Sequence, residues 1–214
     1  MRQALATLRS EGVIAVRRGA RPVVLGPART QSFAELQSFT SWARALREEP
    51  SGRVIELGPR AATTDEARAL GLAEGDEVLG LLRLRLLGER PAMVERTAFA
   101  SRVAGLVTVA DLETGSIYEH LARHGVEVAH ARHAIDAIAA GTLDARLLEV
   151  PRRTPLLRDR RLGLDGDGAP LEWSDDRYRS DLVVFGVDNA TTASSLTRLR
   201  ATDQGADDVD RRAS

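Results

Sequence analysis

Two pairs of long apolar segments, each joined by a short turn, constrain the fold of this chain more than any other feature. Residues 78–87 and 92–100 are joined by Gly-Glu-Arg-Pro, and residues 156–164 and 171–178 are joined by Asp-Gly-Asp-Gly-Ala-Pro. Turn-forming residues between strand-like segments predict β-hairpins. We therefore expect antiparallel sheet to be the main architecture.

Shorter strand and helix patterns surround the two hairpins. Further strands are predicted at 54–61, 126–139 and 182–187, and short helices at 38–48, 64–70, 116–124 and 142–149. Ser38 or Thr40 is the expected N-cap of the first helix, and Thr142 that of the last. Hairpins mixed with short helices predict an α+β fold with an antiparallel sheet. The polar tail at 188–214 is predicted to be disordered.

The residues that are missing or scarce exclude several classes of site. The chain has no cysteine, which excludes disulfides, thiolate metal ligands and cysteine nucleophiles. Its histidines form two close pairs, His120 with His124 and His130 with His133, and neither pair has an evident third ligand. We expect no metal and no cofactor. The apolar runs are shorter than the roughly 20 residues of a membrane span, so a cytoplasmic protein without a membrane partner is predicted.

Basic residues gather at the start of the chain, although its formal net charge is −1. A predicted helix at 2–11 is followed by two apolar runs, 13–16 and 22–25, which flank an arginine-rich turn. Such a pattern is typical of a winged helix, in which the helix enters the major groove and the wing contacts the DNA backbone. An ordinary solvated basic helix is the alternative. The candidate DNA contacts are Arg2, Gln3, Thr7, Arg17, Arg18 and Arg21.

This N-terminal segment resembles the recognition helix and wing of GntR-family transcription regulators. The matching residues are Arg2-Gln3-Ala4-Leu5, Leu8, Glu11-Gly12 and Arg18-Gly19. Arg21-Pro22 departs from the Gly-Thr that the family has in its wing, and the helices that precede the recognition helix in that family have no counterpart here. The resemblance implies a partial winged-helix domain at 1–26 and a linker at 27–31. We expect the chain as given to bind DNA weakly or not at all, because an isolated helix of this length is marginal in water.

The remainder, residues 32–187, resembles the effector-binding UTRA domain of the HutC subfamily of GntR regulators, whose fold is similar to chorismate lyase. The matching pieces are Ser38-Phe39-Thr40, Arg83-Leu84-Arg85, Pro91 with Glu95, Ser116-Ile117-Tyr118, and Leu171-Glu172 with Tyr178-Arg179-Ser180-Asp181. The resemblance implies a transcription regulator, with repression as the expectation, that forms a homodimer on operator DNA and responds to a small-molecule effector.

Residue chemistry independently indicates an anion pocket in this domain. Arg83 and Arg85 are two apart in a predicted strand, so both side chains point to the same face. Two neighbouring guanidinium groups repel unless an anion or an acidic side chain bridges them. Ser38 and Thr40 stand where a helix is expected to begin, and a helix N-terminus also favours anions. A pair of solvated strand arginines is the alternative.

The resemblance extends this pocket to further residues and to a class of effector. The implied effector-binding residues are Ser38, Phe39, Thr40, Arg83, Arg85, Glu95, Ser116, Tyr118, Glu172 and Tyr178. It implies an anionic effector, with a phosphorylated sugar or amino sugar as the first expectation and carboxylated ligands as the rival. The alternative makes the two tyrosines part of the core and gives Glu172 a salt bridge with Arg179 or a neighbour.

Other classes of function remain as alternatives. Glu95 and Glu172 could be the paired carboxylates of a glycosidase, and the fold relationship suggests a lyase by analogy only. Aromatic residues make up only 4% of the chain, which disfavours a sugar-stacking active site, so no catalytic residue is expected. A ligand-binding domain without DNA binding and a pure interaction module, which would show an exposed apolar patch, are the other candidates.

Overall fold

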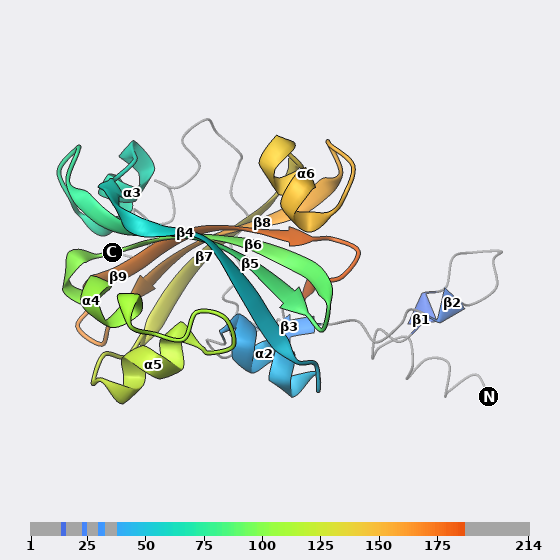
Figure 1. The fold of residues 1–214 in the computed structure, drawn as a ribbon, viewed down its shortest axis with the longest axis horizontal. Helices are drawn as coiled ribbons and strands as arrows, with labels where there is room; N and C mark the ends of the chain where they lie inside the picture. The colour runs from blue at the N-terminus through green and yellow to red at the C-terminus, as the bar shows by residue number, and fades with distance from the viewer. Residues whose placement is uncertain (1–13, 16–22, 25–29, 33–37, 187–214) are drawn as a thin grey trace, which may run out of the picture.

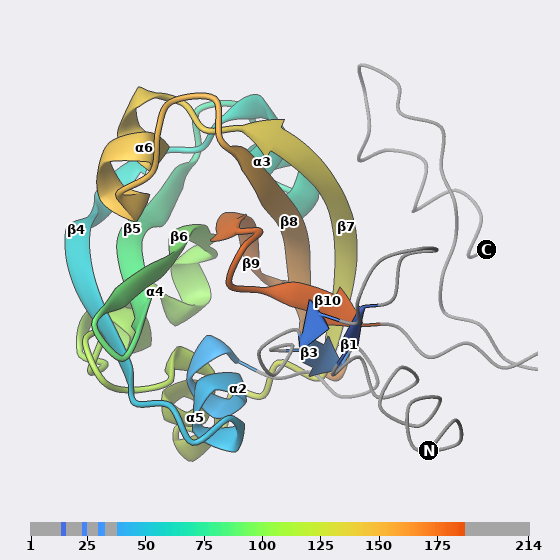
Figure 2. The same cartoon turned by 90° about the vertical axis from the view of Figure 1, so that its right-hand side faces the viewer.

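The computed structural model describes residues 14–15, 23–24, 30–32 and 38–186. Its centre is an antiparallel sheet of six strands in the order β4-β5-β6-β9-β8-β7, so that β4 and β7 are the two edge strands. The sheet is curved (Figures 1 and 2). The strands are β4 (Pro50–Ala61), β5 (Glu77–Leu87), β6 (Arg90–Phe99), β7 (His130–Ala139), β8 (Pro155–Leu164) and β9 (Pro170–Arg179). The predicted α+β fold is confirmed.

The two predicted hairpins lie side by side at the middle of this sheet. One hairpin is β5–β6, the other is β8–β9, and β6 pairs with β9 to join them. Strands β4 and β7 then extend the sheet outward on either side. Each half is therefore a three-stranded antiparallel meander, and side chains at paired positions share one face of the sheet.

Helices cover both faces of the sheet (Figure 1). The described helices are α2 (Phe39–Ala45), α3 (Thr64–Leu70), α4 (Ser101–Thr108), α5 (Ile117–Arg123) and α6 (Thr142–Leu148). Helices α2, α4 and α5 lie on the face that we call the pocket face, where Leu81 and Phe99 pack against α4 and α5, and Met93 packs against α2. Helices α3 and α6 lie on the opposite face, called the outer face, over residues such as Val78 and Val94.

Local sequence explains how several of these helices begin and end. Ser38 caps α2 by accepting a hydrogen bond from the Ser41 amide at 3.1 Å, which confirms one of the two expected caps. Thr63 and Glu66 form a capping box at the start of α3, and Gly71 ends that helix in the left-handed conformation.

Three expectations about element bounds were wrong, and one helix was missed. The cap of α6 is Gly141, without a side-chain hydrogen bond, rather than Thr142. Helix α4 was not predicted, because the strand pattern of β6 continues through Ala100 and hides the helix that follows directly. Strand β4 begins at Pro50, four residues before the expected start, and β7 begins at His130 rather than at residue 126.

Short strands lie outside the main sheet. β10 (Val184–Gly186) confirms a strand within 182–187, but its partner is β3 (Thr30–Ser32) in a parallel ladder, which overlaps the segment expected to be a linker. β1 (Ile14–Ala15) and β2 (Val23–Val24) pair antiparallel, as the predicted wing strands require. The predicted helix 2–11, the basic turn and the tail 188–214 lie outside the described residues.

No helix in the described part of the chain is long and apolar enough to span a bilayer.

Candidate functional site

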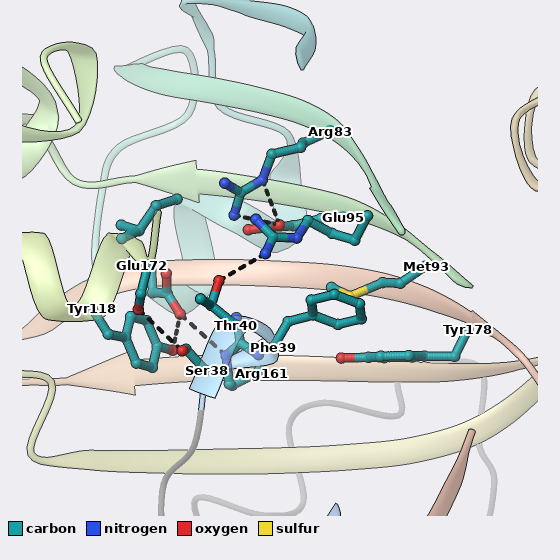
Figure 3. A pocket seen from close by; sticks show the side chains of 13 residues that line it. Ser38, Phe39, Thr40, Arg83, Met93, Glu95, Tyr118, Arg161, Glu172 and Tyr178 are labelled. Carbon is teal, nitrogen blue, oxygen red and sulfur yellow. Dashed lines mark hydrogen bonds and ion pairs between the residues drawn. The ribbon is translucent and has the colours of Figure 1, made fainter. Parts of the chain in front are cut away.

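One pocket on the pocket face gathers side chains from α2, α5 and four strands (Figure 3). Its lining comprises Ser38, Phe39, Thr40, Arg83, Arg85, Met93, Glu95, Ser116, Ile117, Tyr118, Arg161, Glu172 and Tyr178. All ten predicted effector-binding residues are therefore brought together from segments far apart in the sequence. Their role as effector ligands stays a prediction.

Strand register explains why these side chains meet. Arg83 on β5 is paired with Glu95 on β6, and Arg85 is paired with Met93, which in turn is paired with Tyr178 on β9. Directly paired residues point to the same face of a sheet. The alternation within each strand thus places the arginines, the carboxylates and the tyrosine on one surface, as the spacing of Arg83 and Arg85 predicted.

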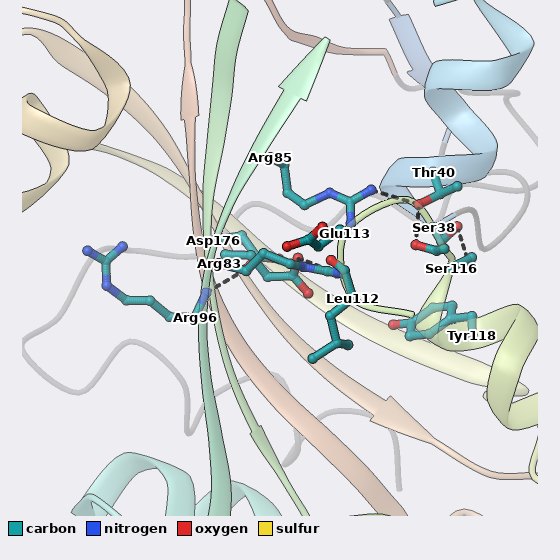
Figure 4. Close-up of polar contacts among 12 residues, drawn as sticks. Ser38, Thr40, Arg83, Arg85, Arg96, Leu112, Glu113, Ser116, Tyr118 and Asp176 are labelled. Atoms are coloured by element: carbon teal, nitrogen blue, oxygen red, sulfur yellow. Dashed lines mark hydrogen bonds and ion pairs between the residues drawn. The ribbon is translucent and has the colours of Figure 1, made fainter. Parts of the chain in front are cut away.

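Arg83 is fully compensated by its neighbours (Figures 3 and 4). Its Nε donates to Glu95 Oε2 at 2.9 Å, its Nη2 lies 2.7 Å from the same oxygen, and its Nη1 donates to the Leu112 carbonyl at 2.7 Å. Burial opposes ionisation of Glu95, but the charges of Arg83 and Arg85 outweigh it and lower the Glu95 pKa. Glu95 is therefore the acid that bridges this arginine.

Arg85 is buried but only partly satisfied. Its side chain has 0% exposure, and its Nη2 donates to Thr40 Oγ1 at 2.7 Å. Its Nε and Nη1 have no hydrogen-bond partner among the described residues. The Phe39 ring lies 4.8 Å from the guanidinium carbon. Burial and the neighbouring Arg83 lower the pKa of Arg85 to about 10, so it stays charged at neutral pH.

The start of α2 forms the wall beside Arg85 (Figures 3 and 4). Ser116 Oγ donates to Ser38 Oγ at 3.0 Å, and Thr40 Oγ1 donates to the Gly115 carbonyl at 3.1 Å. The Ser41 amide is bonded to Ser38 Oγ and is therefore not free to bind a ligand. These two contacts tie α2 to the segment that leads into α5.

A second cluster of polar side chains, from α5, β8 and β9, forms the opposite end of the pocket. Tyr118 Oη donates to Glu172 Oε1 at 2.5 Å, and Arg161 Nε donates to the same oxygen at 3.1 Å. The Arg161 guanidinium also lies over the Tyr118 ring, 5.6 Å from its centroid. Gly163 makes room for this arrangement, because a Cβ there would lie 2.8 Å from Glu172 Cγ.

Three lining residues were not predicted, namely Met93, Ile117 and Arg161, and Arg161 is the charged one. Glu172 was given an alternative salt bridge with Arg179 or a neighbour, and Arg161 is that neighbour, whereas Arg179 pairs with Asp181. The signal lay in the hairpin register, since Arg161 is paired with Ser174, two residues from Glu172 on the same face.

Buried polar groups continue from Arg161 across the sheet. Arg161 Nη1 lies 3.4 Å from Asp176 Oδ2, which has no hydrogen-bond partner in the described chain, and the same holds for the hydroxyls of Thr97 and Ser174. His133 Nδ1 lies 3.0 Å from Asp159 Oδ2 on the neighbouring strand. Within the described residues, no group of three His, Asp or Glu side chains is arranged to hold a metal ion.

Comparisons with known proteins agree with this geometry. The UTRA domain family matches residues 45–183. The chain is 26% identical to the HTH-type transcriptional repressor NagR of Bacillus subtilis over 86% of this chain and 76% of that protein. It is 31% identical to the HTH-type transcriptional repressor PhnF of Mycolicibacterium smegmatis over 86% and 75%, and 25% identical to the Histidine utilization repressor of Pseudomonas putida over 74% and 64%. The crystal structure of PhnF from Mycobacterium smegmatis superposes with a TM-score of 0.74 at 27% identity, covering 89% of this chain and 84% of that one.

Proposed function

The chain belongs to the UTRA domain family of HutC-type GntR regulators, and on that premise we propose that it is a transcription regulator whose pocket senses an anionic small molecule. Its relatives are named repressors, which favours repression here as well. In this proposal the effector binds the pocket of the sheet domain, and the N-terminal segment contacts operator DNA.

The observation that carries the proposal is the state of Arg85. A buried cation with two unpartnered donors is costly, because it has lost water without gaining a full set of hydrogen bonds. An oxyanion beside Arg85 would accept from Nε and Nη1 in the bidentate geometry that arginine favours. Ser38 lines the same part of the pocket and carries a hydroxyl that can donate to the same oxyanion. Phosphate esters and carboxylates both meet these requirements.

The far end of the pocket favours a neutral, hydrogen-bonding group on the effector. Glu172 is an acceptor and Tyr118 and Arg161 are donors, so a hydroxyl or an amide is well matched there. An anionic head at Arg85 and a hydroxyl- or amide-bearing body at Glu172 describe a phosphorylated sugar or amino sugar. A carboxylated ligand remains the rival.

The remaining parts of the proposal concern assembly and DNA. We expect a cytoplasmic homodimer, because two winged helices must match two half-sites of an operator. The proposed DNA contacts lie outside the described residues and are Arg2, Gln3, Thr7, Arg17, Arg18 and Arg21. A sensor that does not itself bind DNA is the second candidate.

An enzymatic role is disfavoured by how the two pocket carboxylates are paired. A glycosidase needs one carboxyl group to be a protonated acid. Glu95 is held ionised by Arg83, which lowers its pKa, and Glu172 accepts from both Tyr118 and Arg161. Both carboxylates are thus already engaged by arginine or tyrosine donors, and we propose that the protein binds its effector without converting it.

The proposal can be tested by ligand-induced stabilisation. We expect glucosamine 6-phosphate, or a carboxylated analogue, to raise the unfolding temperature of the wild type, whereas glucosamine without the phosphate should not. Arg85→Met should abolish this shift, and Arg68→Ala, on α3 at the outer face, should retain it. Equal ligand shifts in Arg85→Met and wild type, or release of a product from the ligand, would refute the proposal.

A further inference from the structure

Strand β8 carries three arginines, and only one of them faces the pocket. Alternation along the strand places Arg158 and Arg160 on the outer face, where both reach Asp136. Arg161 points to the other face, lines the pocket, and keeps 12% of its side chain exposed. A cation is therefore built into the end of the pocket that lies away from Arg85.

Three neighbours hold the Arg161 guanidinium at this end (Figure 3). Nε donates to Glu172 Oε1 at 3.1 Å, Nη1 lies 3.4 Å from Asp176 Oδ2, and the guanidinium lies over the Tyr118 ring. Burial opposes the charge of Arg161, but the three neighbours outweigh it and raise the pKa of Arg161 well above its ordinary value. Arg161 is thus a cation at every pH at which the protein is folded, and its position is fixed.

Without Arg161 this end of the pocket would be acidic. Glu172 lines it, and Asp176 and Asp159 lie close enough to act on the pKa of Arg161. Asp159 is in turn bonded to His133 on the neighbouring strand. Because opposite charges attract over such distances, an acidic end would favour an ammonium group on the effector. Arg161 therefore decides which charge this end of the pocket accepts.

The pair of Arg161 and Glu172 disfavours an effector group of either charge. Tyr118 and Arg161 both donate to Oε1 of Glu172, so Oε2 is left to accept from an effector. An ammonium bound to Oε2 would lie within about 4–6 Å of the Arg161 guanidinium, a separation at which like charges disfavour each other. An anion at the same place would meet Glu172 itself. A hydroxyl or an amide N–H can donate to Oε2 without either repulsion.

We propose that Arg161 is the residue that determines specificity at this end of the pocket, and that it discriminates against effectors carrying a free amine there. The effector is then an anion at one end and an uncharged polyol or acylated amine at the other. This inference rests on the proposed function, because it takes the anionic end of the effector to lie at Arg85. It goes further by separating a sugar phosphate from an amino-sugar phosphate with a free amine.

Two ligands that differ at a single position test the inference. Glucose 6-phosphate has a hydroxyl at carbon 2, where glucosamine 6-phosphate has an ammonium at pH 6. Carbon 2 lies across the sugar ring from the arm that bears the phosphate, so it reaches toward Glu172 when the phosphate lies at Arg85. Calorimetric titration of the wild-type chain at pH 6 should give a dissociation constant roughly tenfold or more lower for glucose 6-phosphate. Equal or tighter binding of glucosamine 6-phosphate would overturn the inference.

Variants of Arg161 test whether this side chain carries the preference. Arg161→Gln keeps a donor for Glu172 but removes the charge, so it should lose or reverse the preference for glucose 6-phosphate. Arg161→Lys keeps the charge and should keep the preference. Arg160→Gln, at the outward-facing neighbour on the same strand, is the matched control and should bind both ligands as the wild type does. An Arg161→Gln variant that retains the wild-type ratio of the two dissociation constants would contradict the assignment.

The ratio of dissociation constants separates selectivity from stability and from the proposed function. A purely structural role for Arg161 would weaken the binding of both ligands equally and leave their ratio unchanged. The wild-type ratio is measured without any variant, so the inference can fail even if Arg161→Gln does not fold. Binding of both ligands without a preference would overturn this inference and leave the proposed anion site intact. Binding of neither ligand would overturn both.

Discussion

The two faces of one sheet differ in how completely their arginines are paired with carboxylates. On the outer face, Arg96 and Arg177 share Asp144, while Arg158 and Arg160 share Asp136, so each of these arginines has a carboxylate partner. On the pocket face, Arg85 has only a hydroxyl, and Asp176 has an oxygen without a hydrogen bond in the described chain. Paired charges join neighbouring strands on the outer face, whereas the two unpartnered donors of Arg85 mark the position at which we propose that the effector binds.

The largest change in stability is expected at the Arg83–Glu95 ion pair inside the pocket. Arg83→Met should lower the free energy of unfolding by about 3–5 kcal/mol, because it leaves the buried Glu95 without its counter-ion. Urea unfolding measures this loss. The double variant Arg83→Met/Glu95→Leu should recover most of the stability, and a double variant as unstable as the single one would contradict this account.

A smaller loss is expected on the outer face. Asp144→Asn removes the buried charge shared by Arg96 and Arg177, while Arg177 keeps Asp175 as a second partner. We expect the free energy of unfolding to fall by about 2 kcal/mol. Urea unfolding measures this loss, and Asp65→Asn, at an exposed residue of α3, is the control. An Asp144→Asn variant as stable as the wild type would contradict the expected difference between the two faces.

Removal of the Arg85 guanidinium should raise the free energy of unfolding instead of lowering it. Without effector, Arg85→Met should raise the free energy of unfolding by about 1–2 kcal/mol, because a buried charge with unmet donors is replaced by an apolar side chain of similar length. The same variant is expected to lose effector binding. If it unfolds as readily as Arg83→Met, then Arg85 is a structural residue and the comparison fails.

The smallest expected effect depends on pH. Burial raises the pKa of Asp176 well above its ordinary value, and Glu95 and Asp159 raise it further while Arg161 opposes the rise. The folded state therefore holds this proton more tightly than the unfolded state, and this carboxyl's contribution to stability declines as pH rises from its unfolded toward its folded pKa. Asp176→Asn removes that decline without removing the acceptor for the Arg96 amide.

Unfolding of wild type and Asp176→Asn at several pH values between 4 and 7.5 checks this expectation. The two proteins should be similar near pH 4, and the variant should be more stable at pH 7 by on the order of 1 kcal/mol. A difference that is the same at every pH would show that Asp176 does not change its protonation within this window.

Period-two patterning anticipated the arginine pair of the pocket, whereas Glu95, Glu172 and Tyr178 were implied by the resemblance to the UTRA domain. Arg83 and Arg85 must share a face once their segment is a strand, and the two hairpins bring Glu95, Glu172 and Tyr178 to that face through register alone. The N-cap of α2 at Ser38 is equally local, because a serine before an apolar helical pattern is a recognisable start signal.

Other features depend on contacts that local patterns do not report. Arg161 is one of several arginines on β8, and only the register between β8 and β9 separates it from Arg158 and Arg160, which face outward. The parallel pairing of β3 with β10 joins segments about 150 residues apart, for which short-range periodicity carries no information. Whether an arginine is compensated likewise follows from packing, not from spacing.

The double use of Ser38 has an evolutionary consequence. One hydroxyl both begins α2 and stands in the wall of the pocket. A substitution that retunes ligand selectivity at this position also weakens the helix unless the new residue is another capping residue. We therefore expect relatives that bind other effectors to keep Ser, Thr, Asn or Asp at position 38. Larger changes in side-chain chemistry are expected at Phe39, Tyr118 or Arg161, because these residues do not cap a helix.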